Sequence, residues 1–321
     1  MIDASIKHSA TGAAETGDRL LEIIARAKAQ QPIRTGVVHP VNGVTLKGVV
    51  SAVDANLISP VLFGPREKIK AAAQEIDFDL NATEVVDAPH SHAAAALAVA
   101  SARAGELEAL MKGALHTDEI MAEVVSRDHG IRTERRVSHV YVMDTPAYEK
   151  LLFMTDAAIN ICPDLEEKRD IVQNSIELAL SLGVSAPKVA ILSAVETVTS
   201  KLKSTIDAAA LCKMSDRGQI TGGVLDGPLA FDNAISKEAA AAKEIISPVA
   251  GQADILIVPD LEAGNMLAKQ LDYLAGAVAA GIVLGARIPI ILTSRAEGTL
   301  PRVASSAVAK LYHYAKANQT K

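Results

Sequence analysis

Short apolar segments rich in Val, Ile and Leu alternate with helix-forming segments along most of this chain. Strands separated by helices of about ten to fifteen residues are typical of βαβ units, whose strands run parallel. Outside the middle of the chain, the predicted strands are residues 35–39, 59–64, 84–87, 109–113, 189–194, 220–225, 254–258, 281–285 and 288–293. The main predicted helices are residues 18–29, 44–55, 91–104, 117–127, 165–182, 204–216, 236–245, 261–278 and 302–316. The alternation therefore predicts an α/β fold with a mostly parallel sheet.

The pattern changes after a polar, basic run at residues 132–136. Two predicted strands, residues 137–143 and 151–159, are joined by a short connection, which indicates an antiparallel hairpin and entry into a second domain. A chain of 321 residues also exceeds the size at which a single core is favourable. The final helix is expected to pack near the first strands. The predicted division is a discontinuous first domain, residues 1–135 plus 286–321, and an inserted second domain, residues 136–285, with a cleft between them.

The composition argues against several classes of protein. A net charge of −6 without clusters of Lys and Arg argues against a nucleic-acid-binding surface. Cys162 and Cys212 lack the spacing of a zinc site or a disulfide framework, so we expect a reducing, cytoplasmic compartment. No signal peptide is recognisable at the N-terminus. The most lipid-like window, residues 274–293, is divided by two glycines and a proline, and indicates a helix end and two buried strands rather than a membrane span.

Ser294 and Arg295 follow the last predicted strand. Ligands of α/β folds bind outside the carboxyl ends of the strands. A guanidinium group presents a planar fork that matches phosphate or carboxylate oxygens, and a serine hydroxyl can add a further hydrogen bond. Arginine residues on a protein surface are commoner than catalytic arginines, so the Ser-Arg dipeptide alone is weak evidence. The position of the pair after a strand is what favours an anion site.

A second candidate site lies at the predicted helix start near residue 117. Thr117 could cap this helix, and the cap would be simple rather than reciprocal, because Ile120 occupies the position where a capping box has Glu or Gln. The same helix N-terminus, with Lys112 and His116 beside it, could instead hold a phosphoryl oxygen. The sequence supports both interpretations about equally.

Two further pairs of polar residues follow predicted strands. Asp226 and Asp232 could form turns, orient a ligand or bind a metal; their spacing favours turns, and a metal site would need more carboxylates. Asn265 and Lys269 are four residues apart, which places them on one face of a helix. A solvated face accounts for Lys269, whereas Gly264 beside Asn265 permits a close backbone approach.

Several sequence motifs are absent from the chain. There is no GxxxxGK[ST] phosphate loop, no GxSxG nucleophile elbow and no HExxH metal motif, and no GxGxxG follows the first predicted strand. His90 and His92 lie at a predicted helix entry, where capping is the favoured interpretation. We therefore predict no metal site.

A set of segments together carries a resemblance to a known family. The segments are VVHPVNGVTLKGVV, LMKGALHTDEIM, RRVSHVYVMDTP, TDAAINICPDLEEKRDIVQNS, PKVAILSAVETV, CKMSDRGQITGGVLDGPLAFDNAIS, SPVAGQADILIVPDLEAGNMLAKQL and PIILTSRAEG. On these segments the chain resembles the phosphate acetyltransferase and phosphate butyryltransferase family. It is especially similar to the phosphotransacetylase-like module that follows an enoyl-CoA hydratase-like domain in some bacteria. The resemblance covers nearly the whole chain from about Thr35 onward.

The resemblance implies two α/β/α domains around an interdomain cleft, an architecture like that of isocitrate and isopropylmalate dehydrogenases, and usually a homodimer. It implies reversible acyl transfer between CoA and inorganic phosphate to give an acyl phosphate, with CoA as a substrate and no further cofactor. Ser294 and Arg295 match the family's Ser-Arg pair at the reacting phosphate and acyl group. Substrate-binding roles are inferred for Lys112, His116, Thr117, Asp226, Asn265 and Lys269.

One departure from the family pattern leaves the catalytic base and the acyl chain length open. Phosphotransacetylases carry an Asp a half-dozen residues after the Ser-Arg pair, where this chain has Leu300 and Pro301; Glu297 is the nearest acid. Two alternative functions also stay open. An isocitrate-dehydrogenase-like oxidoreductase would need a carboxylate cluster for a divalent metal and a nicotinamide site, and the sequence offers neither. A non-catalytic acyl-CoA-binding subunit would bind acyl-CoA tightly without phosphate-dependent release of the thiol.

Overall fold

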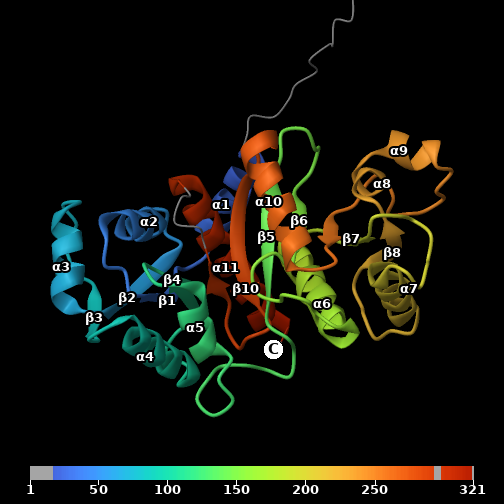
Figure 1. Cartoon of the computed structure of the whole chain (residues 1–321). Helices are drawn as coiled ribbons and strands as arrows, with labels where there is room; N and C mark the ends of the chain where they lie inside the picture. The colour runs from blue at the N-terminus through green and yellow to red at the C-terminus, as the bar shows by residue number, and fades with distance from the viewer. Residues whose placement is uncertain (1–16, 293–297, 320–321) are drawn as a thin grey trace, which may run out of the picture.

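The structure, a computed structural model, describes residues 17–292 and 298–319. Its strands are β1 (Ile33–Val38), β2 (Ile58–Gly64), β3 (Glu84–Asp87), β4 (Ala109–Lys112), β5 (Ser138–Asp144), β6 (Leu152–Thr155), β7 (Lys188–Leu192), β8 (Val224–Leu229), β9 (Ile255–Ile257), β10 (Val278–Leu284) and β11 (Ile290–Ile291). Its helices are α1 (Asp18–Lys28), α2 (Gly43–Asp54), α3 (Arg66–Gln74), α4 (Ser91–Arg103), α5 (Thr117–Val124), α6 (Leu165–Ser181), α7 (Lys203–Asp216), α8 (Phe231–Ile235), α9 (Lys237–Ala242), α10 (Leu261–Ala275) and α11 (Thr299–Gln319). Figure 1 shows their arrangement.

All the described strands belong to one sheet, in the order β3-β2-β1-β4-β11-β10-β5-β6-β9-β7-β8. The strands from β3 to β11 are parallel to one another, and so are β6, β9, β7 and β8. The antiparallel pairs are β10 with β11, β10 with β5, and β5 with β6. The predicted α/β fold with a mostly parallel sheet is confirmed, and so is the predicted hairpin.

Helices cover both faces of the sheet, which gives three layers. Side chains of α1, α2, α3, α6, α7 and α11 share one apolar core with one face of the strands. On the other face, α4 and α5 pack over the first half of the sheet, and α8, α9 and α10 pack over the second half. Along β5, Val140 and Val142 belong to the first core, whereas Met143 faces α10, because successive side chains of a strand point to opposite faces.

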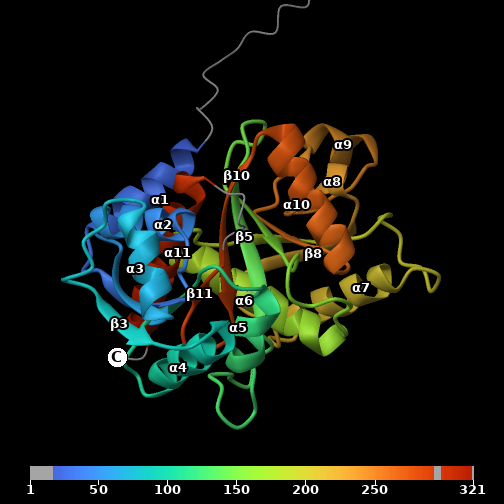
Figure 2. The ribbon, with the colours of Figure 1, turned by 60° about the vertical axis from the view of Figure 1, so that its left-hand side comes forward.

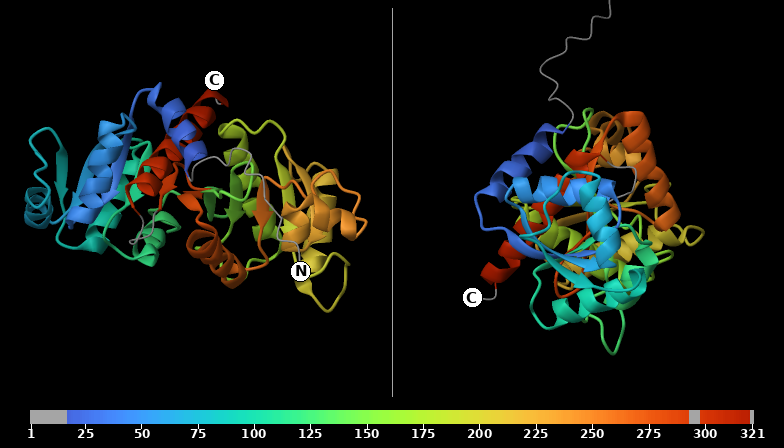
Figure 3. Two further views of the ribbon diagram at one scale, coloured as in Figure 1. Left: turned by 90° about the horizontal axis from the view of Figure 1, so that it is seen from above. Right: turned by 90° about the vertical axis from the view of Figure 1, so that its left-hand side faces the viewer.

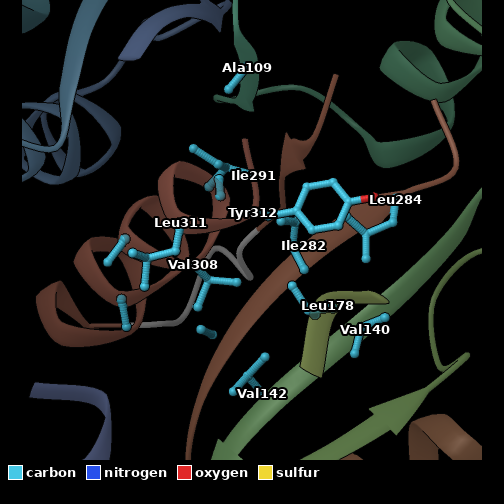
Figure 4. Packing of buried hydrophobic residues seen from close by; sticks show 14 of the residues in the cluster. Ala109, Val140, Val142, Leu178, Ile282, Leu284, Ile291, Val308, Leu311 and Tyr312 are labelled. Atoms are coloured by element: carbon cyan, nitrogen blue, oxygen red, sulfur yellow. The ribbon is translucent and has the colours of Figure 1, made fainter. Parts of the chain in front are cut away.

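The last helix, α11, packs against elements from the beginning of the chain. Figure 4 shows Val308 and Leu311 of α11 near Ile282 and Ile291 of the central strands. Figure 3 shows α11 beside α1. Lys310 is fully buried, and its Nζ donates hydrogen bonds to two backbone carbonyl oxygens, of Gln30 at 2.8 Å and of Asn56 at 2.7 Å. These bonds hold α11 against the connections that precede β1 and β2.

Several predicted elements differ from the structure. The predicted strand 220–225 is wrong, because β8 runs from Val224 to Leu229 and includes Pro228; an edge strand tolerates proline, which has no N–H to donate. The helix predicted at residues 236–245 is the shorter α9, with Ser236 as its N-cap, and the preceding short helix α8 was not predicted. The strand predicted at residues 151–159 ends at Thr155, because Asp156 begins a tight turn.

The division of the chain into two domains stays a prediction, because one sheet runs through both of the predicted parts. The more specific likeness to isocitrate and isopropylmalate dehydrogenases also stays a prediction. Among the helices of the described residues, none combines the length and the apolar character that crossing a membrane requires.

Candidate functional site

The strand ends at β4 and β11 lie side by side. β4 and β11 are parallel, with Met111 opposite Ile291, so the next residues, Lys112 and Leu292, are neighbours. Lys112 is 7% exposed. After β4 the chain passes very close to β1: a Cβ atom on Gly113 would lie only 2.3 Å from the carbonyl oxygen of Val38. Glycine is therefore required where the chain leaves β4 toward α5.

The turn before α5 is held by an acid of the same helix. The helix begins at Thr117 with His116 as its N-cap, and Glu119 Oε1 accepts a hydrogen bond from the His116 N–H at 3.1 Å. Glu119 also pairs with His92 of α4 at 3.4 Å. The hydrogen bond from Ser91 is the main cause that lowers the pKa of Glu119; burial opposes it, and the His116 N–H adds to it.

The predicted cap at Thr117 is therefore wrong by one residue. Counted from His116 as the N-cap, Glu119 stands where a capping box has its acid, and its carboxylate takes up the N-cap N–H. This bond occupies only the N-cap N–H, so the anion-binding interpretation of the helix N-terminus stays a prediction. Binding of substrate by His116 or Thr117 stays a prediction. At α4 the capping interpretation of His90 is confirmed, because its Nδ1 accepts from the Ala93 N–H at 3.2 Å.

A buried carboxylate organises the turn after β6. Asp156 is 3% exposed. It accepts hydrogen bonds from the N–H groups of Ala158 at 2.9 Å, Ile159 at 3.0 Å and Asn160 at 3.2 Å, and from Asn160 Nδ2 at 2.6 Å. Charge-assisted hydrogen bonds of this kind are the strong ones. Sequence reasoning missed Asp156, because the apolar residues 157–159 extended the predicted strand past it; the Asp at the end of an apolar run was the available signal.

Helix α10 packs directly on this turn. A Cβ atom on Gly264 would lie 2.8 Å from the carbonyl oxygen of Asp156 and 3.1 Å from Ala157 Cα, so a larger residue would push the helix away. Asn265 Nδ2 donates to the Ala157 carbonyl oxygen at 3.4 Å. The close approach expected at Gly264 is confirmed. Asn265 joins the start of α10 to the turn after β6, and its contact with a substrate stays a prediction.

His139 of β5 is fully buried, close to Asp156 and to the end of β11. Its ring packs edge-on against Tyr141, with 4.4 Å between the ring centroids. A Cβ atom on Gly281 of β10 would lie 3.0 Å from His139 Nε2 and 2.3 Å from the carbonyl oxygen of Leu292. Gly281 thus allows the end of β11 and the histidine to meet. Burial lowers the pKa of His139 to about 4, against the raising effects of Asp156 and of the Leu292 backbone.

This pKa predicts that the protein loses stability in acid through His139. Between the ordinary pKa of 6.5 and about 4, the unfolded chain binds a proton that the folded protein does not, so the free energy of unfolding falls as the pH falls. One group contributes at most about 1.4 kcal/mol per pH unit. Urea unfolding of the wild type and of His139→Gln at a series of pH values measures this. The variant should show a smaller decline over this window, and equal declines would contradict the assignment.

A cavity of about 330 Å³ lies between α10 and the central strands, and is called the α10 cavity below. Its lining residues are Tyr141, Met143, Ala268, Lys269, Asp272, Tyr273, Ala277, Val278, Ala279, Gly298, Leu300 and Pro301. Lys269 is half exposed, with Nζ 3.9 Å from Asp272 Oδ2 and 5.7 Å from the centre of the Tyr273 ring. The structure therefore places Lys269 at a cavity rather than on a fully solvated face.

A second cavity, of about 400 Å³, is lined by Met121 of α5 and Val125 at its end, by residues 132–137, by Ile159, and by acids of α6. Figure 2 shows α10 to the right of the central strands β5 and β10, and α5 below them. Arg136 Nε donates to Asn160 Oδ1 at 2.7 Å, and Asn160 in turn bonds Asp156. This hydrogen-bonded chain connects the second cavity with the turn that supports α10.

Asp226 does not lie with the other candidate residues. It is inside β8, at the edge of the sheet seven strand positions from β4, or roughly 34 Å at the usual strand spacing. Its Oδ1 accepts from the Gly227 N–H at 2.8 Å, which is a local bond. The prediction that Asp226 lies in a turn is wrong, because this residue is part of a strand. Its position at the edge of the sheet gives no support for a substrate contact. The described residues contain no cluster of His, Cys, Asp or Glu that could hold a metal ion.

Ser294 and Arg295 lie outside the described residues, as does Glu297. The residues on either side of that gap are described. Leu292 neighbours Lys112, and its N–H donates to the Gly281 carbonyl oxygen at 3.2 Å. Gly298 lines the α10 cavity. The chain that carries the predicted Ser-Arg pair therefore starts beside Lys112 and ends at the α10 cavity.

The chain matches known proteins over most of its length. The family model described as "Phosphate acetyl/butaryl transferase" matches residues 91–309. The chain is 62% identical over 290 residues to a phosphate acetyltransferase of Rhizobium meliloti, covering 90% of this chain and 92% of the relative. It is 40% identical to a phosphate butyryltransferase of Clostridium acetobutylicum, covering 90% of this chain and 96% of the relative. A branched-chain phosphotransacylase structure from Enterococcus faecalis superposes with a TM-score of 0.76 at 29% identity, covering 88% of this chain and 99% of that one.

Proposed function

This chain belongs to the phosphate acetyltransferase and phosphate butyryltransferase family, and from that premise we propose that it is a phosphate acyltransferase. It catalyses the reversible reaction of an acyl-CoA with inorganic phosphate to give an acyl phosphate and CoA. The observation that carries the proposal is the 62% identity to a phosphate acetyltransferase over 90% of the chain. The alternatives, a metal-dependent oxidoreductase and a non-catalytic acyl-CoA-binding subunit, are not favoured by these relatives.

The proposed mechanism is a direct attack in a complex of both substrates. A phosphate oxygen attacks the thioester carbon, a C–O bond forms, the C–S bond breaks, and the sulfur leaves as the CoA thiolate and takes up a proton. In the reverse direction the thiolate attacks the acyl phosphate. Arg295 would hold the phosphate and stabilise the charge that develops on the carbonyl oxygen, with Ser294 as a further donor. This assignment rests on the family's Ser-Arg pair.

Positive charge around the proposed site supports the binding of anionic substrates. Lys112 lies beside the strand end that leads to Ser294, and Lys269 lies at the α10 cavity, where that segment of the chain ends. We propose that these two ammonium groups attract phosphate and CoA. Asn265, His116 and Thr117 are proposed to line the path of the substrate rather than to react with it.

The base that deprotonates CoA in the reverse reaction is not a carboxylate at the family's usual position. Leu300 and Pro301 stand there, and both line the α10 cavity. A thiol with a pKa near 8.5 still has a few per cent of thiolate at neutral pH. We propose that cationic side chains around the site raise the fraction of thiolate. Glu297 is the acid nearest in sequence to the family's usual position of the base.

Further properties belong to the same proposal. CoA acts as a substrate, and neither a metal nor another cofactor takes part, because a guanidinium group can supply the positive charge that a metal would otherwise provide. A chelator should then leave the rate unchanged. A homodimer and a cytoplasmic location are proposed from the family resemblance and from the two free cysteines, Cys162 and Cys212. Light scattering of the purified protein tests the dimer.

A thiol-release assay tests the proposed activity. The purified protein is mixed with acetyl-CoA or butyryl-CoA, with and without phosphate, and free thiol is followed with a chromogenic disulfide. We expect thiol release that requires phosphate. Release that is equal without phosphate would indicate a thioesterase instead. Tight binding of acyl-CoA with no release would favour the non-catalytic subunit, and reduction of a nicotinamide cofactor by a hydroxy acid would favour the oxidoreductase.

A further inference from the structure

We propose that the α10 cavity holds the acyl chain of the substrate, and that its small residues allow acyl groups longer than acetyl. The inference rests on the proposed function and names the substrate class of that site. The residues that determine chain length would be Ala268, Ala277 and Ala279, which leave the space open, and Met143 and Leu300, which limit it.

The position of the cavity supports this assignment. The Leu292 N–H donates to the carbonyl oxygen of Gly281, which ties the end of β11 to β10. Ala279 lies two residues before Gly281 on the same face of β10, or about 7 Å along the strand. Gly298, at the start of the chain leading into α11, lines the same cavity. The cavity is therefore next to both ends of the segment that contains the proposed reacting residues.

The lining of the cavity matches a thioester, which is apolar at the acyl end and charged at the other. Met143 is 1% exposed, and Ala268 and Ala277 are each 5% exposed, so the inner wall is apolar and buried. The polar residues belong to the outer side of α10: Lys269 and Asp272 are about half exposed. Small-molecule sites combine mostly apolar walls with a few polar groups that fix orientation.

The size of the cavity exceeds what an acetyl group needs. A water molecule takes up roughly 30 Å³ in the liquid, and a methylene group is of similar size. A cavity of about 330 Å³ therefore has room for several more methylene groups than the single methyl of acetyl. On this basis, propionyl and butyryl groups fit without displacing the wall.

The experiment compares kcat/KM for acetyl-CoA and butyryl-CoA in the full-length protein and three variants. Ala279→Leu fills the cavity, and Leu300→Ala enlarges it. Ala241→Leu makes the same change as the first on the exposed surface of α9 and is the matched control. One methylene group changes specificity by about 10- to 200-fold in apolar pockets. We expect Ala279→Leu to lower the butyryl-to-acetyl ratio of kcat/KM at least about 10-fold. Leu300→Ala should raise this ratio, and the control should leave it unchanged.

Several results would overturn the inference while leaving the proposed function intact. A wild type that releases thiol from acetyl-CoA but not from butyryl-CoA would show that longer groups do not fit. An equal loss with both substrates in a folded Ala279→Leu variant would show that the cavity holds the common CoA arm instead. Leu300→Ala is expected to change the butyryl-to-acetyl ratio in the opposite direction to Ala279→Leu. Unfolding of one variant therefore cannot produce both expected changes. Absence of phosphate-dependent release with every acyl group would instead contradict the proposed function.

Discussion

Replacing Arg295 by alanine is expected to lower kcat for acyl transfer by on the order of 10²- to 10³-fold, while the thermal unfolding midpoint stays near that of the wild type. Removal of one preorganised donor from an oxyanion site has an effect of this size. The guanidinium group is proposed to contact the phosphate and the developing oxyanion, and water replaces it poorly. Steady-state rates in both directions measure the change.

Two further arginine variants make this prediction specific. Arg295→Lys keeps the charge but loses the planar fork, so its activity should lie between that of Arg295→Ala and the wild type. Arg287→Ala removes an exposed arginine eight residues earlier in the chain, whose N–H bonds Ile131, and it should retain wild-type rates. Wild-type turnover in Arg295→Ala would remove this residue from the mechanism.

Asp156→Ala is expected to lower the free energy of unfolding by about 3 kcal/mol or more. The carboxylate is buried and accepts four hydrogen bonds, and removing it leaves buried donors without acceptors, at about 1–3 kcal/mol for each unsatisfied group and less than additively. The turn after β6 also supports Gly264 and Asn265 at the start of α10. We therefore expect weaker substrate binding in any fraction that stays folded.

Urea unfolding at neutral pH measures this loss, and Asp260→Ala is the matched control. Asp260 is the N-cap of α10; it is more exposed than Asp156 and accepts one backbone hydrogen bond, from Ala263 at 2.9 Å. An N-cap of this kind contributes about 1 kcal/mol. An Asp156→Ala protein as stable as Asp260→Ala would show that the four bonds add little to the stability of the folded state.

The sequence predicts the layers of this fold because strands and helices have different apolar periods. β1, β2 and β4 are found within two residues of their predicted bounds, since each contains a short run of mostly apolar residues that is buried on both faces. The strand predicted at residues 288–293 is too long, because β11 pairs with its neighbours only at Ile290 and Ile291. Pro228 argued for a strand end, although an edge strand can include it.

The site was predictable only in part, because it is assembled from distant segments. Strand ends and helix faces indicate Lys112, Asn265 and Lys269 as candidates, and their contact with a substrate stays a prediction. Asp226 follows the same local rule, yet the strand order places β8 at the far edge of the sheet. The α10 cavity joins residues near 141, 268, 279 and 300, and no local pattern relates them. His139 and Gly281 likewise meet only through the pairing of β5 with β10.

A phosphate oxygen is proposed to attack the acyl carbon of acyl-CoA, and an isotope measurement distinguishes this attack from hydrolysis and from phosphoryl transfer. The protein is incubated with acetyl-CoA and phosphate labelled with oxygen-18, and the acyl phosphate is analysed by mass spectrometry. We expect acetyl phosphate that keeps every labelled oxygen of the phosphate, because no P–O bond breaks. Free acetate with no acyl phosphate, or acetyl phosphate that has lost one label, would contradict it.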